Sequence, residues 1–392
     1  MAEWVMKKLK DIAEFNPRES LAKGVVAKKV AMDKLQPFCR DIPGYELEPF
    51  SGGTKFRNGD TIMARITPCL ENGKTAKVAV LDEGEVGFGS TEYIVFRAKD
   101  GIDEDFIYYL VCSPLVREPA IKSMVGSSGR QRVQTDVVQN LEIIVPDYEE
   151  QKQISGILKS LDDKIVANTE INKNLEQQAE ALFHSLFVED VNPIWKEGVL
   201  SDLGTVVAGG TPSKTKPEYY SKKGIAWITP KDLSLNKSKF ISHGEIDISE
   251  LGFSKSSAIK MPTGTVLFSS RAPIGYIAIA ANEVTTNQGF KSVVPNENIG
   301  TAFMYYLLKF LLPTIEGMAS GSTFKEISGA GMKSVPVVIP DNETIDKFNA
   351  FCTPIFKQQE VLEAENSRLV DIRDALLLKL MVGELDVSDI EP

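Results

Sequence analysis

An internal repeat at about half the length of the 392-residue chain constrains its fold more than any other feature. Trp4 recurs as Trp195, 191 positions later, and residues 106–110 (Phe-Ile-Tyr-Tyr-Leu) recur as residues 303–307 (Phe-Met-Tyr-Tyr-Leu). Residues 128–146 likewise resemble the stretch that lies 194 positions further on. A repeat of this kind indicates two related structural units in tandem, and the chain length suits two or three domains.

Each repeat ends in a segment that is predicted to form one long helix. The first begins at Asp147, with Glu150 three residues on at the spacing of a helix capping box, and continues to about residue 187. The second begins at Asp341, and we expect Pro354 to break or kink it early. The offset of 194 continues through both segments without a gap.

Apolar side chains recur at helical spacing along both segments. They are Ile154, Ile157, Leu158, Leu161, Ile165, Ile171, Leu175 and Leu182 in the first, and Phe348, Phe351, Ile355, Val361, Leu362, Leu369, Ile372, Leu376 and Leu380 in the second. A lone helix of about 40 residues, roughly 60 Å long, cannot bury such a stripe, whereas two helices can bury their stripes on each other. Because a globular segment lies between them, we expect them to pack antiparallel. Asn168 interrupts the first stripe; we expect it to be exposed, and a buried side chain that fixes the register is the alternative.

Charge is divided between two kinds of segment. Residues 147–190 hold 4 Lys and Arg against 10 Asp and Glu, and residues 341–392 hold 5 against 12. Residues 1–146 hold 20 against 21, and residues 191–340 hold 15 against 11. The net charge of −10 therefore belongs to the helices and does not argue against a nucleic-acid partner for the globular segments. Helices of fixed length and varied sequence fit a spacer, although any old duplication would leave fewer gaps in helices than in loops.

The globular segments contain short β-branched strands between Gly, Pro, Asn and Asp turns. The expected strands are Thr61–Ala64, Tyr93–Phe96, Val266–Phe268, Tyr276–Ala280 and Val335–Ile339, and helices are expected near 103–122 and 300–316. The stretch 59–65 resembles 264–271 with one gap. We therefore predict an α+β chain with a pseudo-two-fold internal repeat. Two mixed α/β domains (1–146 and 191–340) are separated by two long antiparallel coiled-coil helices (147–190 and 341–392).

The sequence lacks the motifs of the common catalytic and metal sites. It has no GxGxxG, no GxxxxGK[ST] phosphate loop, no GxSxG elbow and no Asp-Pro-Pro-Tyr or Asn-Pro-Pro-Tyr string. A partial match to a nuclease PD…ExK signature at residues 146–152 has too short a spacing. The four cysteines include no CxxC pair, and His184 and His243 are expected to be structural or solvated. We predict no catalytic residues, no metal site, no membrane partner and a cytoplasmic location.

Polar loops recur at matched places in both halves and supply the candidate DNA-binding residues. Arg, Lys, Asn, Gln, Ser and Thr side chains pair with base edges and phosphates. The candidates in the first half are Arg65, Thr67, Ser90, Glu92, Tyr93, Arg130, Gln131 and Arg132. Those in the second half are Thr211, Ser213, Lys214, Lys231, Ser270, Arg271, Asn287, Gln288, Ser322, Thr323 and Lys325. A single loop of this kind could equally be a solvated turn, and the recurrence in both halves favours DNA contact.

Several motifs, taken in their order, resemble the specificity (S, HsdS) subunits of type I restriction–modification systems over essentially the whole chain. They are Gly59-Asp60 through Arg65-Ile66-Thr67-Pro68 with Glu71-Asn72-Gly73-Lys74, Gly209-Gly210-Thr211-Pro212-Ser213 with Trp227-Ile228-Thr229-Pro230-Lys231-Asp232, Gly321-Ser322-Thr323, and Pro146 followed by Glu150-Gln151. The start of the second helix departs from this pattern, because Asn342-Glu343-Thr344 replaces the Glu-Gln pair.

The resemblance implies a non-catalytic, sequence-specific DNA-recognition subunit. Two target recognition domains would each read one half of a bipartite double-stranded DNA sequence, and the helices would set the gap and dock two modification subunits. Those methyltransferase subunits would bind S-adenosylmethionine and methylate adenine, and restriction subunits would use ATP and Mg²⁺ to cleave, while this chain would hold no cofactor. The alternatives are an enzyme that acts on DNA by itself and an adaptor whose two heads do not bind DNA.

Overall fold

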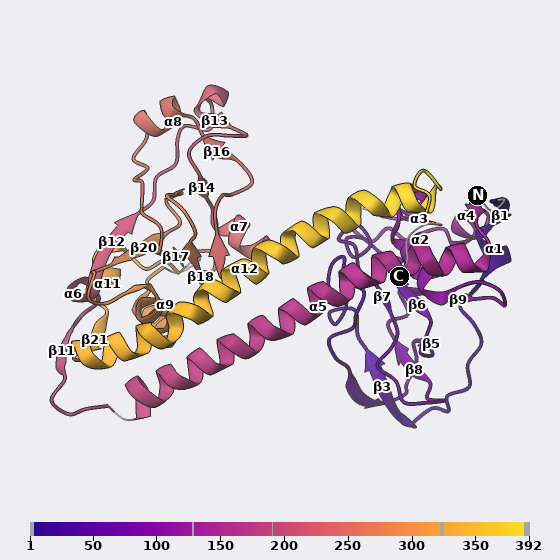
Figure 1. Ribbon diagram of the computed structural model, residues 1–392, viewed down its shortest axis with the longest axis horizontal. Helices are drawn as coiled ribbons and strands as arrows, with labels where there is room; N and C mark the ends of the chain where they lie inside the picture. The colour runs from indigo at the N-terminus through magenta and orange to yellow at the C-terminus, as the bar shows by residue number, and fades with distance from the viewer. Residues whose placement is uncertain (1–3, 128, 190, 322–324, 388–392) are drawn as a thin grey trace. The chain divides into compact units, whose positions relative to one another are not determined.

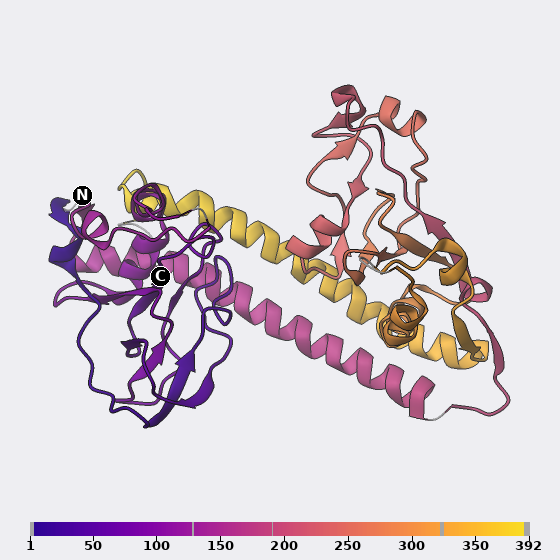
Figure 2. The ribbon, with the colours of Figure 1, turned by 180° about the vertical axis from the view of Figure 1, so that it is seen from behind.

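The computed structural model describes residues 4–127, 129–189, 191–321 and 325–387. They form two compact units: unit 1 comprises residues 1–167 and 366–392, and unit 2 comprises residues 168–365. The division passes through the two long helices, α5 (Tyr148–His184) and α12 (Asn342–Met381), which Figures 1 and 2 show as continuous ribbons. A π-helical turn, Ser185–Glu189, follows α5. None of the helices formed by the described residues is long and apolar enough to cross a membrane.

The described residues of unit 1 form three sheets and four short helices besides its parts of α5 and α12. The first sheet pairs β1 (Val5–Lys8) with β10 (Glu142–Val145). The second has the order β2 (Ala13–Phe15), β9 (Tyr93–Ala98), β6 (Thr61–Ala64), β7 (Thr75–Lys77). The third has the order β4 (Glu46–Pro49), β3 (Val26–Val30), β8 (Gly87–Gly89), β5 (Thr54–Phe56). The helices are α1 (Leu9–Ile12), α2 (Glu104–Cys112), α3 (Pro114–Lys122) and α4 (Thr135–Gln139).

Unit 2 is built around a five-stranded sheet. Its order is β12 (Gly204–Ala208), β20 (Lys291–Pro295), β17 (Val266–Ser270), β18 (Ile274–Ala280), β15 (Phe240–Ile241). In the part of unit 2 that the structure describes, three strand pairs accompany it: β11 (Lys196–Val199) with β21 (Pro336–Ile339), β13 (Tyr220–Ser221) with β16 (Asp247–Ile248), and β14 (Trp227–Ile228) with β19 (Thr285–Thr286). The short helices are α6 (Leu200–Leu203), the 3₁₀ turn Pro217–Tyr219, α7 (Pro230–Leu235), α8 (Glu250–Ser254), α9 (Thr301–Phe310), α10 (Leu312–Met318) and α11 (Gly329–Lys333).

The strand registers confirm the repeat. Val5 faces Val145 in unit 1, and Lys196 faces Ile339 in unit 2, at the offsets of 191 and 194 that the sequence shows. The pair Ala13 and Ala98 corresponds in the same way to Gly204 and Pro295. The expected strands and short helices all lie within or overlap the observed ones, so the mixed α and β content of both globular parts is confirmed.

One detail of the sequence alignment is wrong. Thr61 faces Phe96 and Val266 faces Val293, which aligns residues 59–65 with 264–270 at a constant offset and no gap. Arg65 therefore corresponds to Ser270 and not to Arg271. The sequence suggested a gap because it matched the two arginines by identity, whereas backbone pairing decides which positions are equivalent.

Helix α2 of unit 1 and helix α9 of unit 2 are equivalent in the repeat, but a different side chain caps the start of each. In unit 1, Asp103 accepts a hydrogen bond from the backbone N–H of Phe106 at 2.8 Å. In unit 2 the equivalent residue is Gly300, and the Oδ1 atom of Asn349 on α12 accepts from the N–H of Phe303 at 3.1 Å instead. An uncapped N–H at a buried helix start is costly, so the long helix replaces the missing local cap.

The long helices run antiparallel within each unit, as expected. In unit 1, Asp162 on α5 contacts Arg373 on α12, and the backbone oxygen of Ile165 on α5 accepts from Asn366 on α12 at 3.3 Å. Later residues of α5 thus contact earlier residues of α12. In unit 2, Asn168 Nδ2 donates to Glu365 at 2.8 Å, and Gln359 donates to the backbone oxygen of Asn172 at 3.1 Å.

Two expectations about these helices are corrected. Asn168 is buried rather than exposed, because it faces the other long helix and bonds to Glu365. Pro354 does not break α12, which is helical from Asn342 to Met381. The neighbouring Ile355 and Phe356 are buried in the core of unit 2, and this packing outweighs the loss of one backbone hydrogen bond.

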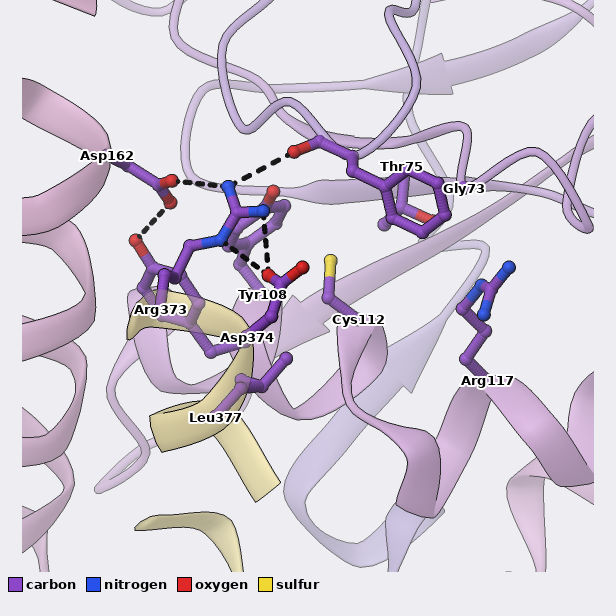
Figure 3. Close-up of a pocket in the computed structure, with 11 residues that line it drawn as sticks. Gly73, Thr75, Tyr108, Cys112, Arg117, Asp162, Arg373, Asp374 and Leu377 are labelled. Atoms are coloured by element: carbon purple, nitrogen blue, oxygen red, sulfur yellow. Dashed lines mark hydrogen bonds and ion pairs between the residues drawn. The ribbon is translucent and has the colours of Figure 1, made fainter. Parts of the chain in front are cut away.

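A buried tyrosine bonds to a carboxylate of α5 in each unit. In unit 1 the Tyr109 hydroxyl donates to Asp162 at 2.8 Å, and the Arg373 guanidinium contacts the other carboxylate oxygen at 2.8 Å. Figure 3 shows Asp162 and Arg373 pointing toward one another at the edge of a cavity of about 40 Å³, which Cys112 and Arg117 also line.

The tyrosine of unit 2 belongs to a larger network. The Tyr306 hydroxyl donates to Glu176 at 2.8 Å, and the buried Lys239 ammonium forms an ion pair with the same carboxylate. Lys239 also donates to Gln359 at 2.7 Å, and Lys309 pairs with Glu176 at 2.8 Å. Burial raises the pKa of Glu176, but Lys239 and Lys309 lower it by more, so that the pKa falls to about 2.

Removal of this carboxylate should destabilise unit 2. In a Glu176→Gln variant the Lys239 ammonium stays buried without its ion-pair partner, so we expect the free energy of unfolding to fall by about 3 kcal/mol. Urea denaturation of the full chain measures the change. The matched control is Glu170→Gln on the same helix, whose exposed pair with Lys173 should contribute less than about 1 kcal/mol. Equal stabilities of the two variants would contradict the role of the network.

The same carboxylate predicts an acid-sensitive unit 2. Because the pKa of Glu176 is lowered from 4.5 to about 2 on folding, its contribution is fully present above pH 4.5 and is lost as the pH falls toward 2. The lysine side chains are protonated in both the folded and the unfolded chain between pH 4.5 and 2, so they do not add to the change of stability with pH. The wild-type chain should therefore lose more stability than Glu176→Gln between pH 4.5 and 2, as measured by urea denaturation at each pH.

Candidate nucleic-acid interface

Three loops of unit 1 meet at the end of β6 and bring most of the first-half candidates together. Loop junction 1 comprises residues 65–68, 90–93 and the described parts of 125–133, namely 125–127 and 129–133. The backbone N–H of Arg65 donates to the oxygen of Glu92 at 2.9 Å, and that of Thr67 donates to the oxygen of Gln131 at 3.0 Å. The N–H of Val133 donates back to the oxygen of Arg65 at 2.9 Å. Loops that are far apart in sequence are therefore fixed to one another through their backbones.

An ion pair with Glu92 fixes the position of Arg132, an exposed cation of loop junction 1. Glu92 accepts two-pronged hydrogen bonds from the Arg132 guanidinium at 2.6 to 3.0 Å. These bonds lower the pKa of Glu92 and raise that of Arg132. Arg132 is exposed beside Arg130, which is also exposed. Glu92 therefore positions Arg132 and leaves Arg130 as the second cation at the surface.

The remaining first-half candidates are more buried. Arg65 is half-buried and donates to the backbone oxygen of Val133 at 3.3 Å, and the Thr67 hydroxyl donates to Glu71 at 3.2 Å. Ser90 accepts from the backbone N–H of Glu92 and shapes its turn. The half-buried Gln131 supplies the backbone oxygen that fixes Thr67.

Tyr93 is corrected as a DNA-binding candidate. Its side chain is 2% exposed and lies in the core, where the hydroxyl donates to the backbone oxygen of Val30 at 3.3 Å. Residues alternate between the two faces of a strand, but at the start of β9 both faces are covered, since Tyr93 to Phe96 are all buried. Tyr93 supports the loop and cannot reach a ligand at the surface.

Unit 2 builds the same junction with different side chains. Loop junction 2 comprises residues 269–273, 287–290 and the described parts of 320–327. The backbone N–H of Ser270 donates to Gly289 at 2.7 Å, and that of Ile327 donates to Ser270 at 3.1 Å. These are the equivalents of the Arg65–Glu92 and Val133–Arg65 bonds. The backbone frame is thus common to both units.

The charge is reversed at one matched position of the two junctions. Arg132 of unit 1 corresponds to Glu326 of unit 2, which pairs with Arg271 at 3.4 Å. Lys325 is exposed beside it, and Ser322 and Thr323 lie outside the described residues. Ser270 is corrected as a candidate, because it is 0% exposed and its hydroxyl donates to the backbone oxygen of Gly289 at 3.0 Å.

Five second-half candidates line one pocket of about 530 Å³ beside loop junction 2. They are Thr211, Lys214, Lys231, Asn287 and Gln288. Ser213 does not line it; it is exposed and its hydroxyl lies 2.9 Å from that of Thr215.

Aromatic residues that the sequence did not nominate form part of this pocket, here called the Trp227 pocket. The Trp227 indole donates to the backbone oxygen of Gly210 at 3.0 Å, and the Tyr220 ring packs edge-on against it at 5.7 Å between centroids. Lys231 pairs with Glu245 at 2.6 Å on the rim. Trp227 is 7% exposed, so its ring forms part of the pocket wall. The signal that could have nominated it is an aromatic residue among Lys, Asn and Gln.

The partial nuclease signature has a structural role. Asp147 caps α5 by accepting from the N–H of Glu150 at 2.9 Å, and Glu150 accepts from the Trp4 indole at 3.1 Å. Gln151 is buried and bonds to the backbone of Asp103. In unit 2, Asp341 takes both roles, capping α12 and accepting from the Trp195 indole at 2.7 Å. Among the described residues, no group of three or more His, Cys, Asp and Glu side chains is arranged to hold a metal ion.

Comparison with known proteins identifies the repeat. The family model described as the type I restriction modification DNA specificity domain matches residues 1–177 and again residues 193–365. The MjaIX type I restriction enzyme specificity subunit of Methanocaldococcus jannaschii is 38% identical over 178 residues, which are 43% of this chain and 41% of that protein. The HindI specificity subunit of Haemophilus influenzae is 24% identical over an alignment of 424 positions that covers 88% of this chain and 89% of that protein.

A solved structure shares the fold. The type I restriction-modification system S subunit of M. genitalium matches with a TM-score of 0.61 at 18% identity, covering 97% of this chain and 96% of that one. The two family matches together span most of the chain and fall on the two halves of the repeat. The chain therefore belongs to the family of type I restriction–modification specificity subunits.

Proposed function

We propose that the chain is a non-catalytic subunit that selects the DNA sequence on which a type I restriction–modification complex acts. Each globular half reads one half of a bipartite double-stranded target, and the long helices set the gap between the half-sites. Two modification subunits dock on the helices and methylate adenine, and restriction subunits cleave. S-adenosylmethionine, ATP and Mg²⁺ belong to those partner subunits.

The single observation that carries this proposal is the pair of loop junctions. Both are held by two equivalent backbone hydrogen bonds, yet they expose different charges, Arg132 with Glu92 in one and Glu326 with Arg271 in the other. A common frame with different surface side chains suits two readers of different sequences. Arginine pairs two-pronged with guanine, and asparagine or glutamine pairs in the same way with adenine.

The long helices suit protein partners better than DNA. They are acidic, so they repel phosphate. Several apolar side chains of the predicted stripes point outward instead of into the helix pair, namely Ile171, Phe351, Val361 and Ile372. Exposed apolar side chains on an acidic surface favour a docking surface for other subunits.

A DNA-binding and methylation experiment separates this proposal from the alternatives. The chain is tested on duplex DNA alone and after assembly with a modification subunit, and the methylated positions are sequenced. Methylation at one split sequence supports the proposal. Methylation or cleavage by the chain alone would indicate an enzyme, and no sequence-selective binding in either state would indicate an adaptor.

Loss of an exposed junction arginine should change one half-site only. In Arg130→Ala we expect discrimination at one base pair to fall by roughly 1–3 kcal/mol if the guanidinium contacts a base. Competition binding with single-base-pair variants of the target measures this. The matched control is Arg18→Ala, since Arg18 is exposed in the same unit at the opposite end of β6. An equal loss on every sequence would mark a phosphate contact instead.

The Trp227 pocket should act on the other half-site. Gln288 is exposed at its rim beside Asn287, and we expect Gln288→Ala to relax the choice of base by roughly 1–3 kcal/mol at one position. The positions that Arg130→Ala affects should be unchanged. Overlap of the two sets of positions in the same competition assay would contradict one reader per unit.

Lengthening both helices should widen the gap. Four alanines inserted after Ala167 in α5 and after Glu365 in α12 add about 6 Å to each helix where it passes from one unit into the other. The gap should grow by about one to two base pairs, at about 3.4 Å each, with both half-sites unchanged. The control insertion, after Pro193 between α5 and β11, should leave the gap unaltered. Methylation sequencing reads both outcomes. An altered half-site with an unchanged gap would contradict the proposal that the helices set the gap.

A further inference from the structure

A second pocket of unit 2 is apolar and unrelated to the DNA-reading candidates. It has a volume of about 410 Å³ and lies where α5, α9, β11 and β21 meet. Its walls include Phe183, Phe187, Trp195, Phe303, Leu307 and Phe310. This pocket is called the aromatic groove below. Phe310, on its edge, is 45% exposed.

The repeat provides an equivalent place in unit 1. At the offsets of the repeat, Phe183 and Phe187 correspond to Leu377 and Met381 of α12, and Trp195 corresponds to Trp4. Phe303 and Leu307 correspond to Phe106 and Leu110 of α2. All five unit 1 residues belong to or pack against one core cluster.

In unit 1 the chain itself covers this place. After α12 it turns at Gly383, where an added Cβ would lie 3.2 Å from the Trp4 ring. Leu385 then packs against the cluster, and Val387 is 0% exposed within it. The segment Val-Gly-Glu-Leu-Asp-Val at residues 382–387 thus places two branched aliphatic side chains, two residues apart, in the core of unit 1.

In unit 2 the chain takes another course. After α5 it forms the π-helical turn and continues to β11, and the linker residues Val191 and Ile194 are both exposed. The linker therefore places neither of these side chains in the aromatic groove. Among the described residues of unit 2, none plays the part that Leu385 and Val387 play in unit 1.

We propose that the aromatic groove is a docking site for an extended segment of a partner protein that carries two branched aliphatic side chains two residues apart. In an extended segment, side chains at positions i and i+2 point to the same side, so two aliphatic side chains two residues apart can enter the groove together. The groove takes one segment per chain, since its counterpart in unit 1 is already filled.

A partner protein fits better than a second copy of this chain. In a second copy Val387 is buried and Leu385 packs against the core of its own unit 1, so release of the segment would expose both side chains to water. A partner whose segment is free loses no such burial. The two halves of the repeat therefore differ for a partner protein. The groove of unit 2 is open, whereas the chain itself fills the equivalent place in unit 1.

A labelled peptide tests the proposal on the full chain. The probe is the fluorescein-labelled hexapeptide Val-Gly-Glu-Leu-Asp-Val, the sequence of residues 382–387, followed by fluorescence anisotropy. We expect saturable binding at one site per chain. The same peptide with serine in place of its leucine and last valine should not bind.

Groove variants locate the site. Phe310→Ser should weaken binding by about tenfold, the effect of losing one aromatic contact. Val338→Ser, which removes a half-exposed side chain from the β21 wall, should also weaken it and provides a second variant if the first misfolds. Leu251→Ser is the matched control, because Leu251 is comparably exposed in unit 2 but does not line the groove.

The outcomes are distinct. Absence of saturable binding, or equal affinity of Phe310→Ser and the wild-type chain, would overturn the proposal. Dimerisation of the wild-type chain that is lost in Phe310→Ser, seen by light scattering, would identify a second copy as the occupant. That result would overturn the proposal that a partner protein occupies the groove. Peptide binding needs no DNA, so failure of sequence-specific DNA recognition leaves this result unaffected.

Discussion

The hydrogen bond between a buried tyrosine and a carboxylate of α5 holds each globular part to the long helices. Tyr109 bonds to Asp162 in unit 1, and Tyr306 bonds to Glu176 in unit 2. The tyrosines are equivalent in the repeat, but their carboxylates are not, since Asp162 and Glu176 lie fourteen residues apart on one helix. A bond to a charged acceptor contributes about 1.5–3 kcal/mol, and Arg373 and Lys239 form ion pairs with the two carboxylates. The two units thus reached one solution with different residues.

This anchoring gives the loop junctions a rigid base. The strands that lead into each junction, β6 and β9 in one unit and β17 and β20 in the other, have the same register. The loops are then fixed to each other by backbone bonds rather than by side chains. Because the frame does not depend on side-chain identity, Arg132 can be replaced by Glu326 at the matched position without loss of the frame. That independence is what a protein needs if its two halves are to recognise different sequences.

The repeat is less symmetric than it first suggests. Asp103 caps α2, whereas Asn349 of the long helix caps α9. Glu150 holds the Trp4 indole, whereas Asp341 holds that of Trp195. The chain fills one apolar site with Leu385 and Val387 and leaves the matching groove of unit 2 lined with aromatic rings. Partners that bind both halves therefore meet two related but different surfaces.

The sequence alone determined the repeat, the two long antiparallel helices and the mixed α and β content, because periodic apolar patterns and capping residues act locally. It also placed five candidates that share the Trp227 pocket. Tertiary structure decided which polar residues face solvent: Tyr93 and Ser270 lie inside, Glu92 positions Arg132, and Asn168 is buried. It also carried α12 through Pro354, because packing of Ile355 and Phe356 outweighs a local propensity. Burial and pairing depend on residues far apart in the chain, so no local pattern reports them.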